Sequence, residues 1–443
     1  MRVIIVGAGE VGYQIAKFLS YETLDVVVID RDRNKLKRIS EEIDVAIVEG
    51  EGGSPSSLRE AEADKADILL AVTDQDETNM IACLLAKAMF GIPRKIARIR
   101  NPEYFHNERL LANLDIDPAI NPELEIAQAI SRIIEAPFAT DIQDFEGGLV
   151  KVIGFKIPET SPLIGKLLKN FVASAGKKFL IGLIVRDGKT IIPAGDDIVK
   201  KGDIIYVPVK PDELQETITL LGITVKPVKN IMILGGGRTG HYIASQIEGK
   251  ADVKIIEKNG ERCKFLSKNL RRSLILHADG TEQKVLTEEN IGDMDAFVAV
   301  SNNDELNIMV SLLAKKLGAK KTVALVNKTD YIYLAHGLGL QSVLSPRLIT
   351  AGTILRYVRR GDILSLTAIA DARAEILEGR ILGTSPLVGK TLENAQPRAS
   401  IIGAIIRGDR VTIPSGSDTI MEDDKLIIFT LKESIREVEK ILA

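Results

Sequence analysis

The chain of 443 residues contains one pattern twice, and this duplication limits the possible folds more than any other feature. The most recognisable matched positions are Gly7, Gly9 and Gly12 in the first copy and Gly235, Gly237 and Gly240 in the second. Further segments match in the same order, at residues 121–127 and 345–351 and at residues 192–195 and 413–416. An ordered series of matches whose offset drifts by a few residues indicates a tandem duplication with small changes in the loops.

The first part of each copy alternates short apolar stretches with stretches of helical character. Strands separated by helices of ten to fifteen residues predict a parallel sheet that is covered on both faces. The expected strands are Val3–Val6, Asp25–Ile29, Val45–Val48, Ile68–Val72 and Ile96–Ile99 in the first copy, and Ile231–Leu234, Val253–Ile256, Ser273–Leu276, Ala296–Val300 and Thr322–Val326 in the second. The sequence therefore predicts a Rossmann-like α/β domain in each copy.

The second part of each copy is predicted to be a small α+β domain. Asp187 and Gly188 separate two apolar stretches, Leu180–Val185 and Thr190–Ile192, as the turn of a β-hairpin would. Gly408 and Asp409 take the same place in the second copy. The expected domains are residues 1–139 and 228–363 for the two Rossmann-like domains, and 140–227 and 364–443 for the two α+β domains.

The glycine loop of the first copy has the spacing of a dinucleotide-binding fingerprint between a predicted strand and the predicted helix Val11–Leu19. Gly7 allows a tight turn, Gly9 allows the backbone to approach a pyrophosphate, and Gly12 allows the helix to pack close to the strand. The start of that helix presents free N–H groups to an anion. Asp30 ends the second strand, where a carboxylate accepts hydrogen bonds from ribose hydroxyls and repels a 2′-phosphate. We therefore expect NAD(H) or an adenine nucleotide rather than NADP(H).

Other candidate residues follow the carboxyl ends of strands, where ligands bind in such folds. Arginines at the end of the fifth strand suit phosphate recognition. The second copy has Asn327 and Lys328 in the corresponding segment, so the two copies need not bind the same nucleotide. The candidate nucleotide-binding residues are Gly7, Ala8, Gly9, Glu10, Val11, Gly12, Asp30, Arg31, Thr73, Asp74, Arg98 and Arg100 in the first copy, and Gly235, Gly237, Arg238, Thr239, Gly240, Glu257 and Asp279 in the second.

Structural roles remain open for part of this set. The segments after the fourth strands, 73–79 and 301–307, share an Asp-Glu-x-Asn pattern that helix capping also explains. Asp279 follows the third strand of the second copy, where a solvated loop carboxylate is as plausible as an adenine contact. A Rossmann fold whose glycine loops serve only as turns is the alternative for both copies.

Composition and residue distribution argue against several functional classes. The formal net charge is −3 and no run of five basic residues occurs, so nucleic-acid binding is not expected. Cys83 and Cys263 stand alone, which excludes a disulfide framework and suits a reducing cytosol. The longest uncharged stretch, residues 331–346, is too short and too polar for a membrane span, and the first residues lead directly into a strand, so no signal peptide is expected.

No arrangement typical of an enzyme is visible. The four histidines lie in the Rossmann-like parts and none has a counterpart in the other copy; they are His106, His241, His277 and His336. The small α+β parts contain no histidine or cysteine. Their clustered aspartates, including Asp197 and Asp203, are explained by turns. We expect neither a catalytic residue nor a metal site.

The whole chain resembles the RCK (regulator of potassium conductance) family, and the tandem of two units resembles its TrkA branch. The segments that carry the resemblance are residues 7–12, 97–102 and 161–166, the last repeated as 385–390. The resemblance implies a cytoplasmic regulatory subunit of a Trk-type potassium uptake system, at the inner face of the membrane through a membrane-embedded potassium transporter subunit. It also implies a homo-oligomer, a dimer or a tetrameric ring, that binds NAD(H) or ATP/ADP and shifts between conformations.

The resemblance further implies that the helices 122–134 and 346–358 cross over to a neighbouring Rossmann half. In the first of these, an apolar face consistent with such a contact comprises Leu124, Ile126, Ala127, Ile130, Ile133 and Ile134. Burial within the same chain explains this face equally well. Three other functions remain as alternatives: an NAD-dependent oxidoreductase, an RCK regulator of a potassium channel or efflux system, and a scaffold with vestigial nucleotide sites.

Overall fold

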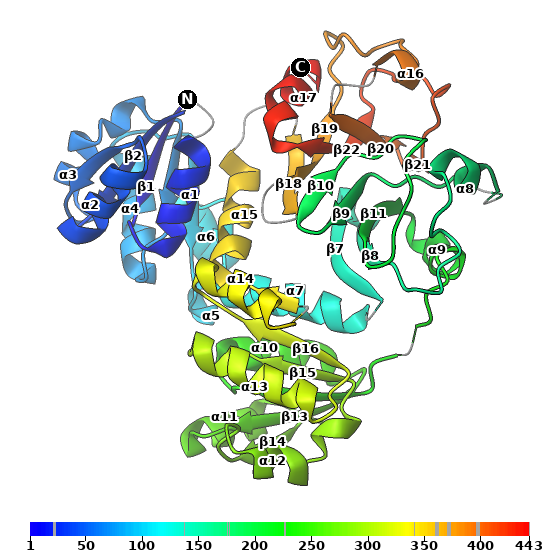
Figure 1. Cartoon of the computed structure of the whole chain (residues 1–443). Helices are drawn as coiled ribbons and strands as arrows, with labels where there is room; N and C mark the ends of the chain where they lie inside the picture. The colour runs from blue at the N-terminus through cyan, green and yellow to red at the C-terminus, as the bar shows by residue number, and fades with distance from the viewer. Residues whose placement is uncertain are drawn as a thin grey trace. The chain divides into compact units, whose positions relative to one another are not determined.

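The computed structural model describes residues 1–20, 24–136, 138–174, 176, 178–225, 227–340, 342–358, 363–369, 374–395 and 399–442. The chain forms two compact units. One comprises Met1–Ser131 and Lys229–Val358, and the other comprises Arg132–Val228 and Arg359–Ala443. Figure 1 shows the chain coloured from its N-terminus to its C-terminus and labels many of the elements of both units.

The first Rossmann half is a parallel six-stranded sheet in the order β3-β2-β1-β4-β5-β6. Its central strand carries Val3 to Val6 with no exposed surface, as a strand covered by helices on both faces requires. Its elements are β1 (Arg2–Val6), α1 (Glu10–Ser20), β2 (Asp25–Asp30), α2 (Arg33–Glu42), β3 (Ala46–Glu49), α3 (Pro55–Glu60), η1 (Ala63–Lys65), β4 (Ile68–Ala71), α4 (Asp76–Ala88), β5 (Arg94–Arg98), α5 (Pro102–Phe105), α6 (Glu108–Leu114), β6 (Ala119–Ile120) and α7 (Pro122–Glu135).

The second Rossmann half repeats this topology in the order β14-β13-β12-β15-β16-β17. Its elements are β12 (Asn230–Leu234), α10 (Arg238–Ile247), β13 (Asp252–Glu257), α11 (Gly260–Asn269), β14 (Leu274–His277), α12 (Gln283–Glu288), η4 (Ile291–Asp293), β15 (Ala296–Ala299), α13 (Asp304–Lys316), β16 (Lys321–Leu325), α14 (Thr329–Gly337), β17 (Ser342–Leu344) and α15 (Pro346–Val358). The tandem α/β prediction is confirmed, and all ten expected strands are present with ends shifted by one or two residues. The sequence did not predict the sixth strands β6 and β17, because two or three residues leave no readable alternation.

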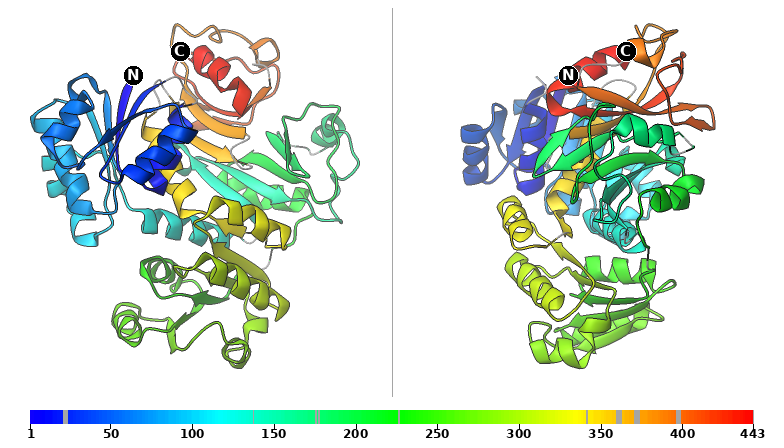
Figure 2. Two further views of the ribbon diagram at one scale, coloured as in Figure 1. Left: turned by 60° about the vertical axis from the view of Figure 1, so that its left-hand side comes forward. Right: turned by 45° about the vertical axis from the view of Figure 1, so that its right-hand side comes forward.

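The last helix of each Rossmann half packs on the other half. In α15, Ala351, Ile354 and Leu355 join the core that also contains Ile15 and Leu19 of α1. Both views of Figure 2 show the yellow α15 beside the dark blue α1. The expected neighbouring Rossmann half is therefore the other copy within the same chain.

On the reciprocal side, α7 contacts α10, where Ser131 Oγ donates a hydrogen bond of 2.7 Å to Gln246 Oε1. Thr353 Oγ1 donates at 3.1 Å to Glu125 Oε2, so the two crossover helices also contact each other. The predicted apolar face of α7 is buried except for the half-buried Leu124.

The second unit contains two antiparallel five-stranded sheets, in the orders β10-β9-β11-β8-β7 and β18-β19-β22-β20-β21. The predicted turn is present, with Asp187 at φ +49° and Gly188 at φ +71°. The elements are β7 (Ala139–Phe145), η2 (Glu146–Gly148), β8 (Val150–Lys156), α8 (Leu168–Ser174), β9 (Leu183–Arg186), β10 (Lys189–Ile191), β11 (Ile204–Val209), η3 (Pro211–Glu213), α9 (Leu214–Leu220), β18 (Ile363–Ile369), β19 (Ala374–Arg380), α16 (Leu392–Ala395), β20 (Ser400–Arg407), β21 (Arg410–Thr412), β22 (Lys425–Leu431), η5 (Lys432–Ser434) and α17 (Ile435–Leu442).

The two small domains share an apolar contact inside this unit. Phe429 has no exposed surface and packs against Gly182 and Gly403, where an added Cβ would lie 2.3 and 2.4 Å from its ring. An ion pair also joins the two small domains, with Lys178 Nζ 2.9 Å from Asp418 Oδ2. The repeated domains are thus joined pairwise, one pair in each unit.

Candidate functional site

The first glycine loop has a shape that only glycine allows at two positions. Gly7 has a φ of +115°, a conformation that side chains rarely adopt. A Cβ on Gly12 would lie 1.9 Å from Gly7 O, so α1 can begin this close to β1 only without a side chain there. A Cβ on Gly9 would meet no atom within 4 Å. The loop therefore needs Gly7 and Gly12 for its own shape and leaves open space beside Gly9.

Asp30 is held at the end of β2 by backbone donors. Its Oδ2 accepts a hydrogen bond of 2.6 Å from Ala8 N, and its Oδ1 accepts one of 2.8 Å from Asp32 N. Each carboxylate oxygen has a second lone pair, so both can still accept from a ligand hydroxyl. The carboxylate is thereby fixed against the glycine loop in the place expected for a ribose-binding acid.

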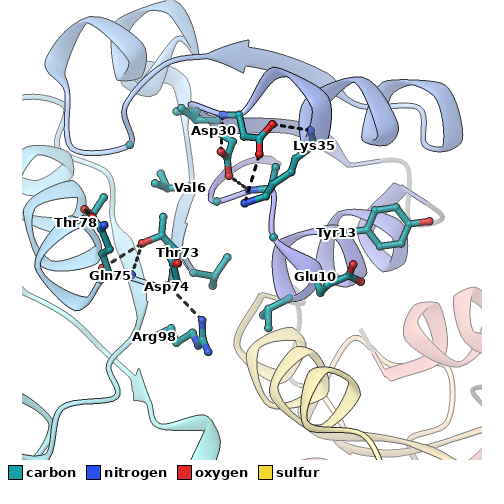
Figure 3. Close-up of a pocket in the computed structure, with 18 of the residues that line it drawn as sticks. Val6, Glu10, Tyr13, Asp30, Lys35, Thr73, Asp74, Gln75, Thr78 and Arg98 are labelled. Atoms are coloured by element: carbon teal, nitrogen blue, oxygen red, sulfur yellow. Dashed lines mark hydrogen bonds and ion pairs between the residues drawn. The ribbon is translucent and has the colours of Figure 1, made fainter. Parts of the chain in front are cut away.

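The buried Asn79 organises the carboxyl ends of β4 and β5. Its Oδ1 accepts from Thr73 N at 2.9 Å and from Thr73 Oγ1 at 2.7 Å, and its Nδ2 donates to Arg98 O at 2.8 Å. Asn79 belongs to the Asp-Glu-x-Asn pattern that capping explains, and the structure adds this link between the two strands. It positions Thr73 and Arg98 on the same side of the sheet (Figure 3).

The guanidinium group of Arg98 has only part of its hydrogen-bonding capacity used by the described residues. Its Nη1 donates to Thr73 O at 3.2 Å, whereas its Nε is buried and has no hydrogen-bond partner among the described residues. Burial, with the nearby charge of Arg100 as a smaller cause, lowers the pKa of Arg98. A partly desolvated guanidinium that lines the pocket is suited to binding an anion.

These groups surround a pocket of about 550 Å³, a volume typical of ligand sites. Ten of the twelve candidate residues of the first copy line it: Gly7, Ala8, Gly9, Glu10, Val11, Asp30, Arg31, Thr73, Asp74 and Arg98. Gly12 lies beneath the loop. Arg100 lies outside the lining, because its Nε donates at 2.7 Å to Glu123 Oε1 at the start of α7.

The pocket also contains residues that the sequence did not indicate. Lys35 and Arg38 come from α2, and Gly52 comes from the loop after β3. Arg347 and Thr350 come from α15 of the second copy, more than 300 residues from the glycine loop in the chain. Nothing in the sequence around Arg347 links it to this loop, since only the packing of α15 on α1 brings it there.

The second glycine loop has the same backbone framework. Gly235 has a φ of +107°, a Cβ on Gly240 would lie 2.0 Å from Gly235 O, and Gly237 faces open space. Glu257 replaces Asp30 and accepts from Gly236 N at 2.7 Å and from Asn259 N at 2.8 Å. The duplication has therefore preserved the loop and its acid.

The surroundings of the second loop differ in their charges. Asn307 Nδ2 donates to Leu325 O, which identifies Leu325 as the counterpart of Arg98. Arg262 Nε donates at 2.5 Å to Gly236 O inside the loop. The second copy thus lacks the buried cation of the first and has an arginine bound to the loop itself.

The remaining candidates of the second copy lie at its edges. Arg238 is half exposed, 3.9 Å from Glu123 Oε1, and Thr239 follows it in the first turn of α10. Asp279 Oδ1 accepts from Thr281 N at 2.9 Å and from Thr281 Oγ1 at 2.7 Å, and these hydrogen bonds lower the pKa of Asp279. The carboxylate of Asp279 is engaged in its own turn.

Within the described residues, no three His, Cys, Asp or Glu side chains converge as metal ligands do. Asp203, one of the clustered aspartates, accepts from Arg186 Nε at 2.9 Å and from Lys200 N at 2.8 Å. None of the described helices has the length and apolar character needed to cross a bilayer.

Comparison with known proteins covers the whole chain. The TrkA-N domain model matches residues 3–122 and 231–346, and the TrkA-C domain model matches residues 152–222 and 376–443. The Trk system potassium uptake protein TrkA of Halomonas elongata is 36% identical over 451 residues, covering 100% of this chain and 98% of the relative. The TrkA homolog 1 of Methanosarcina mazei is 37% identical over 450 residues, covering 99% of each chain.

Solved structures share the fold at low sequence identity. The GsuK RCK domain aligns over 100% of this chain and 94% of its own, with a TM-score of 0.63 and 17% identity. The GsuK channel bound to NAD aligns over 100% of this chain and 78% of its own, with the same TM-score and identity. The RCK fold is therefore present in both copies.

Proposed function

The chain belongs to the family of Trk system potassium uptake proteins TrkA, and we propose that it is the nucleotide-sensing regulatory subunit of such a system. The observation that carries the proposal is the pocket at the first glycine loop. It combines an open approach at Gly9, a fixed acid at Asp30 and a partly unpaired cation at Arg98. These three groups match the pyrophosphate, the ribose and a further anionic part of a nucleotide.

The proposed ligand of the first half is NAD(H) or ATP/ADP. One solved structure of this fold is a GsuK channel bound to NAD and another is GsuK bound to ADP, which supports the same ligand class here. We assign ligand contacts to the candidate residues that line the pocket, and keep Gly12 as the residue that shapes the loop. We propose no occupant for the second loop. The apolar Leu325 stands there in place of Arg98, and the nearby Arg262 donates its Nε hydrogen bond to Gly236 O of the loop itself.

The proposed domain division is 1–139, 140–227, 228–363 and 364–443, with a Rossmann-like sensor half preceding each small domain. The proposed location is the cytoplasmic face of the membrane, where the chain would bind a membrane-embedded transporter subunit. The proposed role is regulatory rather than catalytic, and it is supported by the matching relatives, which are potassium uptake proteins.

Regulation requires that nucleotide bind one conformation better than another. A tenfold preference corresponds to about 1.4 kcal/mol per site. Four equivalent sites in a tetrameric ring would add up to about 5.5 kcal/mol, which moves a two-state equilibrium from about 1:99 to 99:1. The proposed switch therefore depends on a homo-oligomer, and a chain that stays monomeric at micromolar concentration with nucleotide present would contradict it.

The function is tested by rubidium influx into cells that express a Trk-type membrane subunit with the wild-type chain, with Gly9→Asp, or without the chain. A Cβ at position 9 would meet no atom within 4 Å, and the carboxylate that it carries would repel a pyrophosphate beside the loop. We expect influx to depend on the wild-type chain and to lose its nucleotide response in Gly9→Asp. Influx that is the same in all three cell lines would contradict the proposal, and turnover of NADH by the purified chain would instead favour an oxidoreductase.

A further inference from the structure

One basic side chain of the first pocket comes from the second repeat. Arg347, in the first turn of α15, is mostly buried and points its Nη1 to within 3.0 Å of Glu10 Oε2. Glu10 follows Gly9 directly and begins α1, so Arg347 reaches the part of the loop where a phosphate would lie. In Figure 3, α15 (yellow) lies beside the start of α1 and the labelled Glu10.

Glu10 holds two guanidinium groups at this place. Its second oxygen, Oε1, lies 3.0 Å from Arg38 Nη1, so the carboxylate bridges α2 and α15. A carboxylate that joins two arginines beside a glycine loop occupies the position of an anion. A phosphate group offers the same two arginines more acceptor oxygens and more charge than Glu10 does.

The charge of the pocket lining depends on Arg347. The five basic lining residues are Arg31, Lys35, Arg38, Arg98 and Arg347, and the five acidic ones are Glu10, Asp30, Asp32, Glu51 and Asp74. The formal charges cancel, and without Arg347 the lining would be negative and would repel a phosphate. The first repeat alone therefore supplies an incomplete anion site.

The second repeat has the same contact with its charges reversed. By the offsets of the duplication, Glu10 corresponds to Arg238 and Arg347 corresponds to Glu123. Arg238 Nη1 lies 3.9 Å from Glu123 Oε1, so the loop is basic and the helix acidic. The helix thus packs on the loop whether the positive charge lies on the helix or on the loop. At the first loop the crossover helix carries the cation, and at the second it carries the anion.

We propose that Arg347 binds a phosphate group of the nucleotide held at the first glycine loop, exchanging its contact with Glu10 for the phosphate. A residue of the second repeat then completes the site of the first. This inference rests on the proposed function and adds a physical link, because the ligand binds best when α15 stays docked on α1. Nucleotide at one Rossmann half is thereby coupled to the position of the other.

The test is competition against NADH fluorescence on the full chain, using ADP and adenosine as probes. Arg347→Gln keeps a polar side chain and removes its charge together with the guanidinium group. We expect it to weaken ADP about tenfold, the loss of one charge-assisted hydrogen bond at a partly exposed site, and to leave adenosine unchanged. Arg347→Lys should recover most of the ADP affinity, which shows that the loss does not come from misfolding. The matched control is Arg109→Gln on the exposed face of α6, with no change expected.

Glu10→Gln separates ligand binding from a purely structural ion pair. This variant releases Arg347 from its ion pair. The affinity for ADP should therefore rise if Arg347 binds phosphate, and fall if the ion pair only holds the loop in place. Equal affinities of Arg347→Gln and Arg109→Gln for ADP, or parallel losses for ADP and adenosine, would overturn the inference while the proposed function stands. Wild-type protein that binds neither NADH nor ADP would instead refute the proposed function itself.

Discussion

The two glycine loops of this chain share a backbone and differ in charge. In both, the third glycine of the motif packs so closely on the first that an added Cβ would lie about 2 Å from its carbonyl oxygen. In both, the acid at the end of the second strand accepts a hydrogen bond from a backbone N–H of the loop. At the first loop Arg98 and Arg347 face the pocket, whereas at the second Leu325 replaces Arg98 and Arg262 binds the loop carbonyl. The glycine pattern therefore specifies a turn, and we expect the cations around it to decide whether an anion can bind.

Because the two loops share a backbone framework, matched glycine substitutions should destabilise the two halves equally. Gly12→Ala and Gly240→Ala each place a methyl group on a backbone oxygen, so each should lower the free energy of unfolding by about 3 kcal/mol. Urea unfolding of the two variants measures this, with Gly9→Ala and Gly237→Ala as controls in open space. A large effect in only one half would show that the loops do not have the same structural requirement.

The different charges predict an unequal effect on binding. Arg98→Leu copies the second loop into the first and removes a partly buried cation, so nucleotide affinity should fall about 50-fold. Arg100→Gln should change it less than about threefold, because that guanidinium binds Glu123 outside the pocket. Titration calorimetry compares the two variants, and a larger loss for Arg100→Gln would refute the distinction between them.

The stability of the protein at acid pH tests the hydrogen bonds of Asp295 in the second Rossmann half. Burial acts to raise the pKa of Asp295, but hydrogen bonds from Lys320 and from the N–H groups of Lys229 and Asn230 outweigh it and lower that pKa to about 2. Since the folded pKa lies below the ordinary value of 3.8, the stabilisation is fully present above that value and is lost as the pH falls toward 2. It amounts to about 2 kcal/mol.

Asp295→Asn should therefore be less stable than wild type at pH 7, and the difference should shrink between pH 4 and about 2. Thermal unfolding across this pH range measures the difference. A gap that stays constant with pH would mean that the charge of Asp295 is not the source of the stabilisation.

The smallest effect concerns the choice between cofactors. Asp30 should repel a 2′-phosphate, so the wild-type chain should bind NADH about tenfold more tightly than NADPH. Asp30→Ser should narrow this ratio, and Glu257→Ser in the second loop should leave it unchanged. Fluorescence titration with both cofactors gives the ratios. A ratio that responds to Glu257→Ser would place the bound cofactor at the second loop.

Local patterns were enough to predict five strands of each Rossmann half, the two glycine loops and the acid on the second strand, because each depends on residues close in the chain. The surroundings of the pocket were not predictable in this way. Arg347 enters it only through the packing of α15 on α1, and Arg100 leaves it only through the contact with Glu123 on α7. The position of Arg347 depends on the exchange of crossover helices between the repeats, for which the sequence shows an apolar face but no partner. The position of Arg100 depends on a contact within the first repeat that the spacing of the two residues does not indicate.

The most direct test of the central claim, that the first Rossmann half is the nucleotide site, is calorimetric titration of three proteins with NADH, NAD⁺, ATP and ADP. They are the wild type, Gly9→Asp and the matched Gly237→Asp, and at both positions an added Cβ would meet no atom within 4 Å. We predict saturable binding of at least one nucleotide to the wild type and to Gly237→Asp, and its loss in Gly9→Asp. Binding that survives Gly9→Asp and disappears in Gly237→Asp would contradict the claim.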